Sequence, residues 1–469
     1  MVEEDVMGDG RRLIALGAPV HMSGIGGVGM AGLALLLRSA GIHVSGCDLQ
    51  PGPFSEGLRA TGIPVGTGHA WEQTQPPVEW VIRSPAVRME QPDLQHALSR
   101  GLPIARRGEV LPVLVEQAAR SVAVAGTHGK TTTSTLIAQL MERLEPSWCI
   151  GGVSACYPMP GGTGNGPLVV EADESDGTLA HYTADVALVT NVDFDHMEHF
   201  ASVADFEQCF ATFMGQARDC VVYCADDARA TSLALSSRKK VLGYGFSATA
   251  PVRGAWTGKR EMVVSFPDGR EMPITLPRTL PGRHNALNLL GALAVCYELD
   301  VPERIWKPAI QELSLPARRF EVVADGCGIQ VVTDYAHHPV EIRAVIRMAR
   351  ELHAGRLLVV FQPHRYTRTL ALLDAFPEAF AGVDRLVLTP VYAASEKPLA
   401  GASSKDLQHQ FSAKNGVCDA VLAENLEQAA TLIGNEMRSG DLILVIGAGD
   451  VEKVGGMLAQ VIPHLNESK

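Results

Sequence analysis

Short apolar runs alternate with amphipathic helical patterns along most of the chain. Residues 122–125 form a four-residue run of the kind that makes a buried strand, and apolar residues then recur at helical spacing between positions 136 and 144. The same alternation precedes this segment in residues 18–110 and continues after it toward the C-terminus. Alternating strand and helix patterns predict an α/β protein built on parallel sheets.

The alternation divides into three units in series. Strand alternation and hairpin turns around residues 245–280 predict an insertion in the second unit, and Pro316 breaks the pattern before the third. We therefore expect three domains with one sheet each, at residues 1–118, 119–315 and 316–469.

The turn between the strand at 122–125 and the following helix has the sequence Gly-Thr-His-Gly-Lys-Thr, residues 126–131. Glycines let backbone N–H groups turn inward, and a helix N-terminus adds positive potential. Lys130 would meet the outer phosphates, and the Thr131 hydroxyl would meet Mg²⁺. The pattern predicts a phosphate-binding loop, although the standard P-loop spacing would need glycine where Val124 stands. The alternative is a chance strand–turn–helix with a surface lysine.

Two later apolar runs, within residues 167–176 and 186–199, are each followed by acidic residues. Glu171 stands in the first segment, and His196 stands in the second. Ligands bind at the carboxyl ends of parallel strands, so we expect both residues to lie near Lys130. Thr131 and Glu171 carry hard oxygen atoms suited to Mg²⁺. The alternatives are a solvated acid at position 171 and a core or hydrogen-bonding histidine at position 196.

A second glycine-rich turn, residues 24–29, follows a strand pattern near the N-terminus and opens a helix pattern. Its G-x-G-x-x-G spacing, with Asp48 nineteen residues past Gly29, is typical of dinucleotide-binding units. It predicts a diphosphate nucleotide at this helix N-terminus without identifying the nucleotide. A turn that needs glycine only for close packing is the alternative.

Composition narrows the class of protein. A net charge of −12 over 469 residues argues against nucleic acid as the main partner. The nine cysteines form no C-x-x-C pair, which favours a reducing compartment. The first residues have no apolar signal-peptide core, and no run of 18 apolar residues occurs, so we expect a cytoplasmic protein without a membrane span. The oligomeric state, monomer or weak dimer, stays open.

Eight segments resemble those of the Mur ligase family in identity and order: AGTHGKTTT, EADESDGT, NVDFDHME, GRHNALN, ARRFE, TDYAHHP, FQPHRYTRT and VIGAGD. The resemblance implies an N-terminal Rossmann-like UDP-substrate domain, a central P-loop-type ATPase domain with a mainly parallel sheet, and a C-terminal Rossmann-like domain. It also implies ATP-driven joining of L-alanine to the lactyl carboxylate of UDP-N-acetylmuramate through an acyl phosphate, with Mg²⁺, in peptidoglycan precursor synthesis.

The resemblance assigns roles residue by residue. Residues implied to bind ATP are Gly126, Thr127, His128, Gly129, Lys130, Thr131, Thr132, Asn285, Asn288 and Asp334. Implied metal ligands are Thr131, Glu171 and His196, and implied catalytic residues are Lys130, His196 and Arg319. The implied UDP-sugar contacts are Gly24, Gly26, Gly27, Gly29, Asp48, His69 and Ser84. The implied amino-acid pocket consists of Tyr335, His337, His364, Arg365, Arg368 and Ala448.

Several alternatives stay open at this level. Asn285 could only cap its helix, and any single pocket residue could be a surface or salt-bridge residue. Arg365 and Arg368 stand three apart at a predicted strand-to-helix junction, a spacing that could aim both guanidiniums at one carboxylate. Arg83 stands where the resemblance leads us to expect a small residue.

The resemblance also bears on the type of ligase. Several relatives carry a modified lysine after the DHM histidine, but residues 197–219 contain no lysine, which agrees with the alanine-adding type. The rivals are a ligase that recycles murein tripeptide onto the same UDP-sugar, an NAD-dependent dehydrogenase suggested by residues 24–29, and a nucleotide-binding regulator without turnover.

Overall fold

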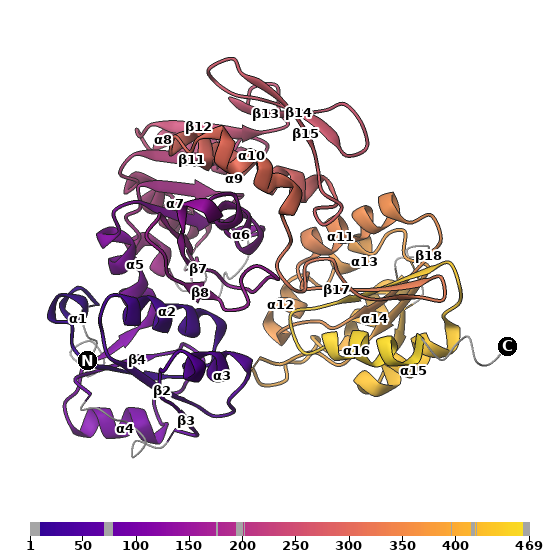
Figure 1. The fold of residues 1–469 in the computed structure, drawn as a ribbon. Coiled ribbons are helices and arrows are strands. Elements are labelled where there is room, and N and C mark those ends of the chain that lie inside the picture. The colour runs from indigo at the N-terminus through magenta and orange to yellow at the C-terminus, as the bar shows by residue number, and fades with distance from the viewer. Residues whose placement is uncertain are drawn as a thin grey trace. The chain divides into compact units, whose positions relative to one another are not determined.

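Three separate sheets organise the chain (Figure 1). The computed structural model describes residues 10–69, 78–174, 177–193, 200, 202–394, 396–413, 418 and 420–462. The predicted α/β class is confirmed. The chain groups into two compact units, residues 1–281 with 285–316, and residues 282–284 with 317–469. Two sheets lie in the first unit, and the three domain boundaries stay a prediction.

The first sheet is parallel throughout, with strand order β3-β2-β1-β4-β5. Every residue of β1 is buried, as a central strand covered on both faces requires. The bounds are α1 Gly10–Leu16, β1 Val20–Ser23, α2 Val28–Ser39, β2 Val44–Asp48, α3 Pro53–Ala60, β3 Val65–Thr67, β4 Trp80–Arg83, α4 Pro92–Ser99, β5 Ile104–Arg106 and α5 Arg107–Gln117.

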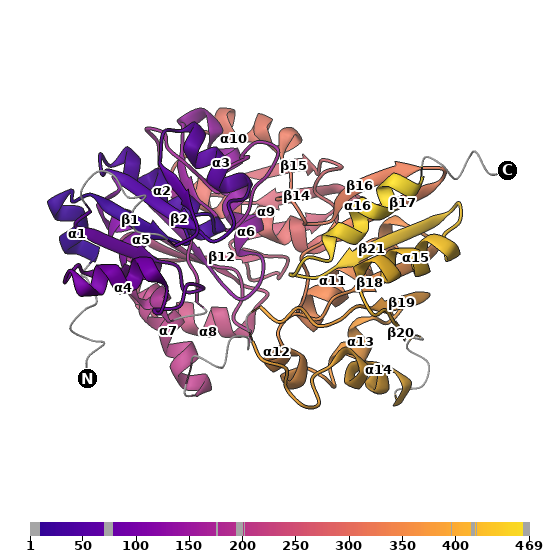
Figure 2. The same ribbon diagram turned by 90° about the horizontal axis from the view of Figure 1, so that it is seen from below.

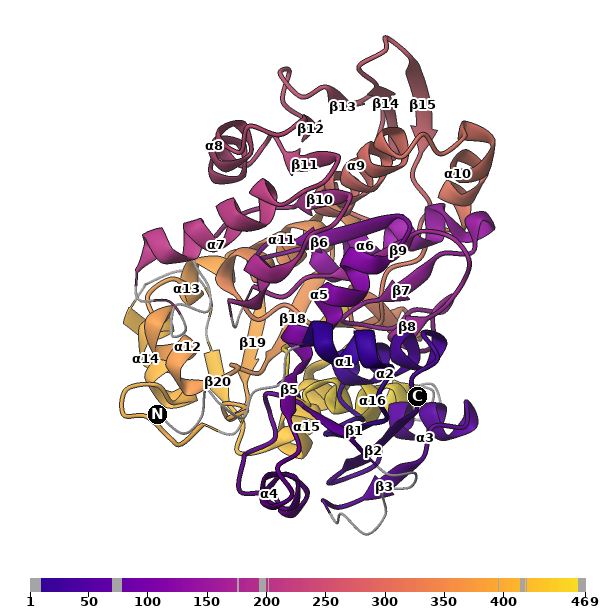
Figure 3. The ribbon, with the colours of Figure 1, turned by 90° about the vertical axis from the view of Figure 1, so that its left-hand side faces the viewer.

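The second sheet has ten strands in the order β15-β14-β13-β12-β11-β10-β6-β9-β7-β8, which can be followed in Figure 3. Strands β7, β9, β6, β10, β11, β12 and β13 are parallel neighbours in this order, and β8 pairs antiparallel with β7 at one edge. Strands β13–β15 form the antiparallel insertion predicted at 245–280. The bounds are β6 Ser121–Ala125, α6 Lys130–Leu140, η3 Glu142–Leu144, β7 Ser147–Cys149, β8 Gly161–Gly162, β9 Leu168–Glu171, η4 Thr178–His181, β10 Val186–Val189, α7 Val203–Gly215, β11 Cys220–Cys224, α8 Ala228–Ser236, β12 Val241–Gly245, β13 Val252–Trp256, β14 Glu261–Ser265, β15 Glu271–Thr275, α9 Arg283–Glu298, α10 Glu303–Ala309 and η6 Ile310–Glu312.

Strand β6 shows how this sheet is packed on both faces. Val122 and Val124 join one hydrophobic cluster with α6 and α9, and Ala123 and Ala125 join another with α5 and α7. The second cluster continues without interruption into the core of the first sheet, including β1 and α2. A shared core accounts for the grouping of these two sheets in one unit.

The third sheet has the order β16-β17-β21-β18-β19-β20 and is parallel apart from the β16–β17 hairpin. Alternate residues of its strands pack against α11, α13 and α14 on one face and against α15 and α16 on the other (Figure 2). The bounds are β16 Glu321–Gly326, β17 Ile329–Asp334, α11 Pro339–Leu352, β18 Arg356–Phe361, α12 Tyr366–Ala371, α13 Phe376–Ala379, β19 Arg385–Leu388, α14 Ser404–Ala413, β20 Ala420–Leu422, α15 Leu426–Glu436, β21 Asp441–Ile446 and α16 Glu452–Val461.

A buried carboxylate fixes the start of strand β6. Asp185 Oδ2 accepts hydrogen bonds from the Ser121 backbone N–H at 2.7 Å and the Ser121 hydroxyl at 3.1 Å, and it pairs with Arg218 at 2.9 Å. Because Asp185 is only 7% exposed, its removal would leave these donors without a replacement in water.

We therefore expect Asp185→Ala to lower the free energy of unfolding by about 2 kcal/mol, since the substitution breaks a largely buried hydrogen-bonded ion pair. The measurement is the urea midpoint of the full chain. The matched control is Asp268→Ala, which removes an exposed carboxylate paired with Arg270 and should move the midpoint far less. Equal shifts in the two variants would contradict this account.

Candidate active site

The loop after β6 has a backbone conformation that glycine favours at two positions. Gly126 has φ +133° and Gly129 has φ +84°, and a Cβ on Gly129 would lie 2.7 Å from Asn288 Oδ1. The amide oxygen of Asn191 accepts from the His128 N–H at 2.9 Å, and its amide nitrogen donates to the His128 carbonyl at 2.8 Å. The predicted strand–loop–helix is therefore confirmed as local structure, and Asn191 holds it in shape.

Lys130 begins helix α6 and points back over the loop. Its ammonium donates to the Gly126 carbonyl at 2.6 Å and to Glu174 Oε1 at 2.8 Å, and its side chain is 14% exposed. Burial alone would lower the pKa of Lys130, but Glu174, Asp173 and Glu171 together raise it. The lysine is therefore a charged group held at the loop, as a phosphate-binding role requires.

Glu174 is a candidate that sequence reasoning missed. Its residue is 1% exposed, and Oε2 has no hydrogen-bond partner among the described residues. Burial raises the pKa of Glu174 to about 7, although Lys130 acts in the opposite direction. The signal that the sequence offers for Glu174 is its place in the EADES run, three residues past Glu171.

The predicted metal ligands lie around the turn after β7. Glu171, at the end of β9, accepts from the Gly151 N–H at 2.8 Å, and a Cβ on Gly152 would lie 2.9 Å from the Thr131 methyl group. Together with the unpartnered Oε2 of Glu174, these residues form a set of hard oxygen donors, which fits Mg²⁺. His196 lies outside the described residues.

The two predicted asparagines differ in what they contact. The Asn288 side chain lies against Gly129 of the loop, as a nucleotide-site residue would. The Asn285 amide donates to the Pro281 carbonyl at 2.7 Å and is buried, so it holds the segment before α9. Asn285 is the third residue of α9 and its side chain donates to a carbonyl, so this contact is not an N-cap; its role beside the nucleotide stays a prediction.

The glycine loop of the first sheet is held by strand β2. The Cys47 carbonyl accepts from the N–H groups of Gly24 and Ile25, and Asp48 Oδ2 accepts from the Gly26 N–H at 2.9 Å. Asp48 thus stabilises the loop itself, and its predicted uridine contact remains untested. Ser84 lies directly against the loop: a Cβ added to Gly24 would be 3.0 Å from the Cβ of Ser84.

Arg107 is a second residue that sequence reasoning missed. It begins α5, and a Cβ on Gly29 would lie 3.0 Å from its Nη1. Its Nη2 is 3.4 Å from Asp173 Oδ2, in the acidic segment after β9. A guanidinium therefore lies between the glycine loop of the first sheet and the carboxylates of the second, within one unit.

In the second unit, Asp334 holds the turn that carries Arg319. Its carboxylate accepts from the N–H groups of Phe320 and Ala336, both at 2.8 Å. Burial raises the pKa of Asp334 to about 6, while Arg319 lowers it. The Arg319 guanidinium lies 5.4 Å from the centre of the Tyr335 ring. The structure thus brings Arg319, Asp334 and Tyr335 together.

The predicted amino-acid residues also gather in this unit. The His364 ring lies 5.8 Å from that of His337, and its Nδ1 is 3.1 Å from Arg368 Nη1. Burial, with help from His337 and Arg368, lowers the pKa of His364 to about 3, so the ring is neutral. Ala448 follows β21, next to Gly447, whose N–H donates to the Asp334 carbonyl.

Arg365 lies between β18 and α12 and Arg368 lies in the first turn of α12, so both stand at the predicted strand-to-helix junction. Both guanidiniums act on the His364 ring, and their convergence on one carboxylate stays a prediction. Arg365 Nε donates to Glu396 at 2.7 Å, and Arg368 contacts His364. Glu396 lies 31 residues past Arg365, so no local pattern indicated that it would bind one of the two arginines.

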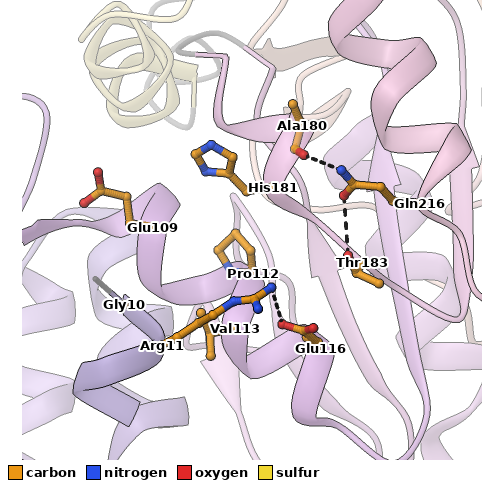
Figure 4. Close-up of a pocket in the computed structure, with 10 residues that line it drawn as sticks. All are labelled: Gly10, Arg11, Glu109, Pro112, Val113, Glu116, Ala180, His181, Thr183 and Gln216. Carbon is orange, nitrogen blue, oxygen red and sulfur yellow. Dashed lines mark hydrogen bonds and ion pairs between the residues drawn. The ribbon is translucent and has the colours of Figure 1, made fainter. Parts of the chain in front are cut away.

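A hollow of about 460 Å³ in the first unit lies apart from these residues (Figure 4). It is lined by segments of α1, α5 and η4, with Arg11 paired to Glu116 at its wall. None of the predicted site residues that the structure describes lines it. In addition, none of the helices in the described parts of the chain combines the length and hydropathy that a membrane span requires.

Comparisons with known proteins bear directly on this arrangement. Three family descriptions match: "Mur ligase family, catalytic domain" at residues 19–119, "Mur ligase middle domain" at 124–296 and "Mur ligase, glutamate ligase domain" at 318–449. The UDP-N-acetylmuramate–L-alanine ligase of Methylorubrum extorquens is 37% identical, with 92% of this chain and 95% of that protein covered. The ligase of the same name from Carboxydothermus hydrogenoformans is 34% identical, with 93% and 95% covered.

Solved structures agree in fold. The UDP-N-acetylmuramate–alanine ligase of Thermotoga maritima matches with a TM-score of 0.79 and 26% identity, over 96% of this chain and all of that one. A murein peptide ligase of Psychrobacter arcticus shares the fold, with a TM-score of 0.71 and 21% identity over 95% and 98% of the chains. The matched domains, the relatives and the loop geometry together show that the chain belongs to the Mur ligase family.

Proposed function

We propose that this protein joins L-alanine to the lactyl carboxylate of UDP-N-acetylmuramate at the expense of ATP. A carboxylate oxygen takes the γ-phosphoryl group of ATP, which gives an acyl phosphate and ADP. The alanine amine then attacks the carbonyl carbon, the C–O bond to phosphate breaks, and an amide, inorganic phosphate and a proton result. The alanine ligases that are 34–37% identical over nearly the whole chain support this reaction over its rivals.

The observation that carries the proposal is the buried Lys130–Glu174 pair at the loop after β6. Phosphoryl transfer needs positioning and charge neutralisation more than covalent help from the protein. Lys130 is charged and donates to three oxygen atoms, those of the Gly126 and Thr127 carbonyls and of Glu174, which it could exchange for phosphate oxygens. The loop N–H groups and the start of α6 add donors around it.

The residues beside the Lys130 loop would also hold Mg²⁺. Thr131, Glu171 and Glu174 would hold the ion, and His196 is a further ligand implied by the family resemblance. When bound, the ion neutralises charge on the phosphate oxygens as the phosphoryl group moves. Glu174 must be ionised to serve as a ligand, and its raised pKa places that ionisation near neutral pH.

The UDP-sugar diphosphate would lie on the Gly24–Gly29 loop, where α2 begins. Arg107 beside Gly29 adds a positive charge that suits a diphosphate or the acyl phosphate. Asp173, 3.4 Å from Arg107, orients the guanidinium and moderates its charge. We therefore include Arg107 among the substrate-binding residues.

Arg368 is the better candidate for the alanine carboxylate. Its guanidinium is buried and contacts the neutral ring of His364, and the Arg365 guanidinium is held by Glu396. A buried guanidinium can bind a carboxylate with two parallel hydrogen bonds. In the same unit, Arg319 and Asp334 would serve the phosphate and ribose, as the resemblance implies.

The proposed reaction is tested by mass spectrometry of the products. The protein is incubated with UDP-N-acetylmuramate, ATP and Mg²⁺, and with L-alanine, glycine, L-serine or the murein tripeptide L-Ala-γ-D-Glu-meso-diaminopimelate separately. We expect an L-alanyl product with stoichiometric ADP. Product with the tripeptide and none with L-alanine would support recycling, which the shared fold of the murein peptide ligase keeps as the second candidate.

A second prediction concerns pH. Because burial raises the pKa of Glu174 to about 7, its carboxylate gains a proton as the pH falls through neutrality. The affinity for Mg·ATP should therefore fall about tenfold between about pH 8 and about pH 6. Calorimetric titrations across this range should show that step in the wild type and lose it in Glu174→Gln.

The matched control is Glu171→Gln, which removes a neighbouring carboxylate and should keep the pH step while lowering the affinity throughout. A step that persists unchanged in Glu174→Gln would assign the titration to the nucleotide or to another group, and would remove Glu174 from the metal site.

A third prediction concerns amino-acid binding. Arg368→Lys should raise the KM for L-alanine about 100-fold, because an ammonium cannot reproduce a two-bond guanidinium contact. Arg365→Lys is the matched control and should have a smaller effect, since Glu396 already binds that side chain. Acyl-phosphate formation, trapped without L-alanine, should survive in Arg368→Lys; its loss would move Arg368 to the phosphate site.

A further inference from the structure

A cluster of metal-ligating side chains lies inside the first sheet, outside the proposed catalytic machinery. His21 comes from β1, Cys47 from β2 and Asp93 from the first turn of α4. Figure 3 labels these three elements. His69 follows β3, and its Nδ1 lies beside Cys47 and Asp93. Their exposed fractions are 1% for His21, 0% for Cys47 and Asp93, and 9% for His69.

The donor atoms are spaced as metal ligands are. Cys47 Sγ lies 3.2 Å from Asp93 Oδ2 and 3.3 Å from His69 Nδ1, and the last two atoms are 3.5 Å apart. A triangle with these sides places each atom about 1.9 Å from its centre, close to the zinc–ligand distances of about 2.0–2.3 Å. His21, Cys47 and Asp93 also offer one ligand atom each within 4.8 Å of one another.

The charge balance favours a cation at this point. Asp93 Oδ1 has no hydrogen-bond partner among the described residues, and no lysine or arginine in that part of the chain pairs with Asp93. Asp93 Oδ2 accepts from the Cys47 thiol, and it lies 3.5 Å from His69, which is a positive partner only when that ring is protonated. A fully buried carboxylate without a compensating positive charge is costly, and a divalent cation would neutralise it.

The surrounding contacts orient the ligands. His21 Nδ1 lies 3.2 Å from the Ser45 hydroxyl, which leaves Nε2 as the nitrogen that would face the cation. Metal-bound histidines commonly make such a hydrogen bond through the other ring nitrogen, and it fixes the tautomer. A thiolate, two imidazoles and a carboxylate form a donor set suited to zinc, in contrast to the oxygen donors of Thr131 and Glu171.

We propose that His21, Cys47, His69 and Asp93 form a structural site for a zinc-like divalent cation beneath the Gly24–Gly29 loop. The site would stabilise that loop, because the Cys47 carbonyl accepts from both Gly24 and Ile25. This inference does not depend on the proposed reaction. It gives His69 a structural role in place of the predicted uridine contact.

Cobalt binding to the full-length protein tests the proposal. The protein is purified, stripped with a chelator and titrated with Co²⁺, which reports a thiolate ligand by charge-transfer absorption in the near ultraviolet. We expect a stoichiometric band that Zn²⁺ abolishes, and a melting temperature that rises with Zn²⁺ because the ion binds only the folded state. The predicted Mg²⁺ site contains no sulfur and cannot produce this band.

Substitutions identify the residues that produce the charge-transfer band. Cys47→Ser should abolish it, and Asp93→Asn should weaken Co²⁺ binding at least tenfold. The matched control is Cys224→Ser, which alters another buried strand cysteine, in β11, and should keep the full band. If the wild type neither binds Co²⁺ through a thiolate nor gains stability from Zn²⁺, the cluster is a hydrogen-bonded polar core and the proposal is wrong, whether or not the variants fold.

Discussion

The candidate active site depends on one buried ion pair, between Lys130 and Glu174 at 2.8 Å. The lysine begins helix α6 on the glycine loop, and the glutamate follows the neighbouring strand β9. Each group would be costly to bury alone, so each retains its place partly because of the other. Oxygen atoms of a bound phosphate could replace Glu174 as partners of Lys130 and free the carboxylate for a metal ion. The pair thus fixes a positively charged side chain at the glycine loop.

Carboxylates also hold the loops at two other predicted sites, where they bind backbone N–H groups. Asp48 holds the loop before α2 through the Gly26 N–H, and Asp334 holds the turn of Arg319 through the Phe320 N–H. In each case a carboxylate at the end of a parallel strand fixes backbone next to a basic or N–H-rich surface. Anionic substrates are what such surfaces accept, which agrees with a reaction among a nucleotide, a UDP-sugar and an amino acid.

The sequence predicted the features that depend on local pattern. Strand alternation, the two glycine loops and the hairpin insertion near 245–280 follow from spacing and turn chemistry, and the structure contains them. Glu174, Arg107 and Glu396 were missed because their positions depend on packing between distant segments: Glu174 is 44 residues from Lys130, and Glu396 is 31 from Arg365. Arg107 reaches Gly29 only because α2 and α5 share one core.

The central claim is that the Lys130 loop serves transfer of a phosphoryl group to the lactyl carboxylate. Its most direct test uses UDP-N-acetylmuramate labelled with ¹⁸O in that carboxylate, together with ATP, Mg²⁺ and L-alanine, and measures the isotope in the inorganic phosphate released. An acyl phosphate keeps one carboxylate oxygen on phosphorus when the amine displaces it, so the account predicts one ¹⁸O atom in each phosphate. Unlabelled phosphate formed alongside the amide product would contradict it.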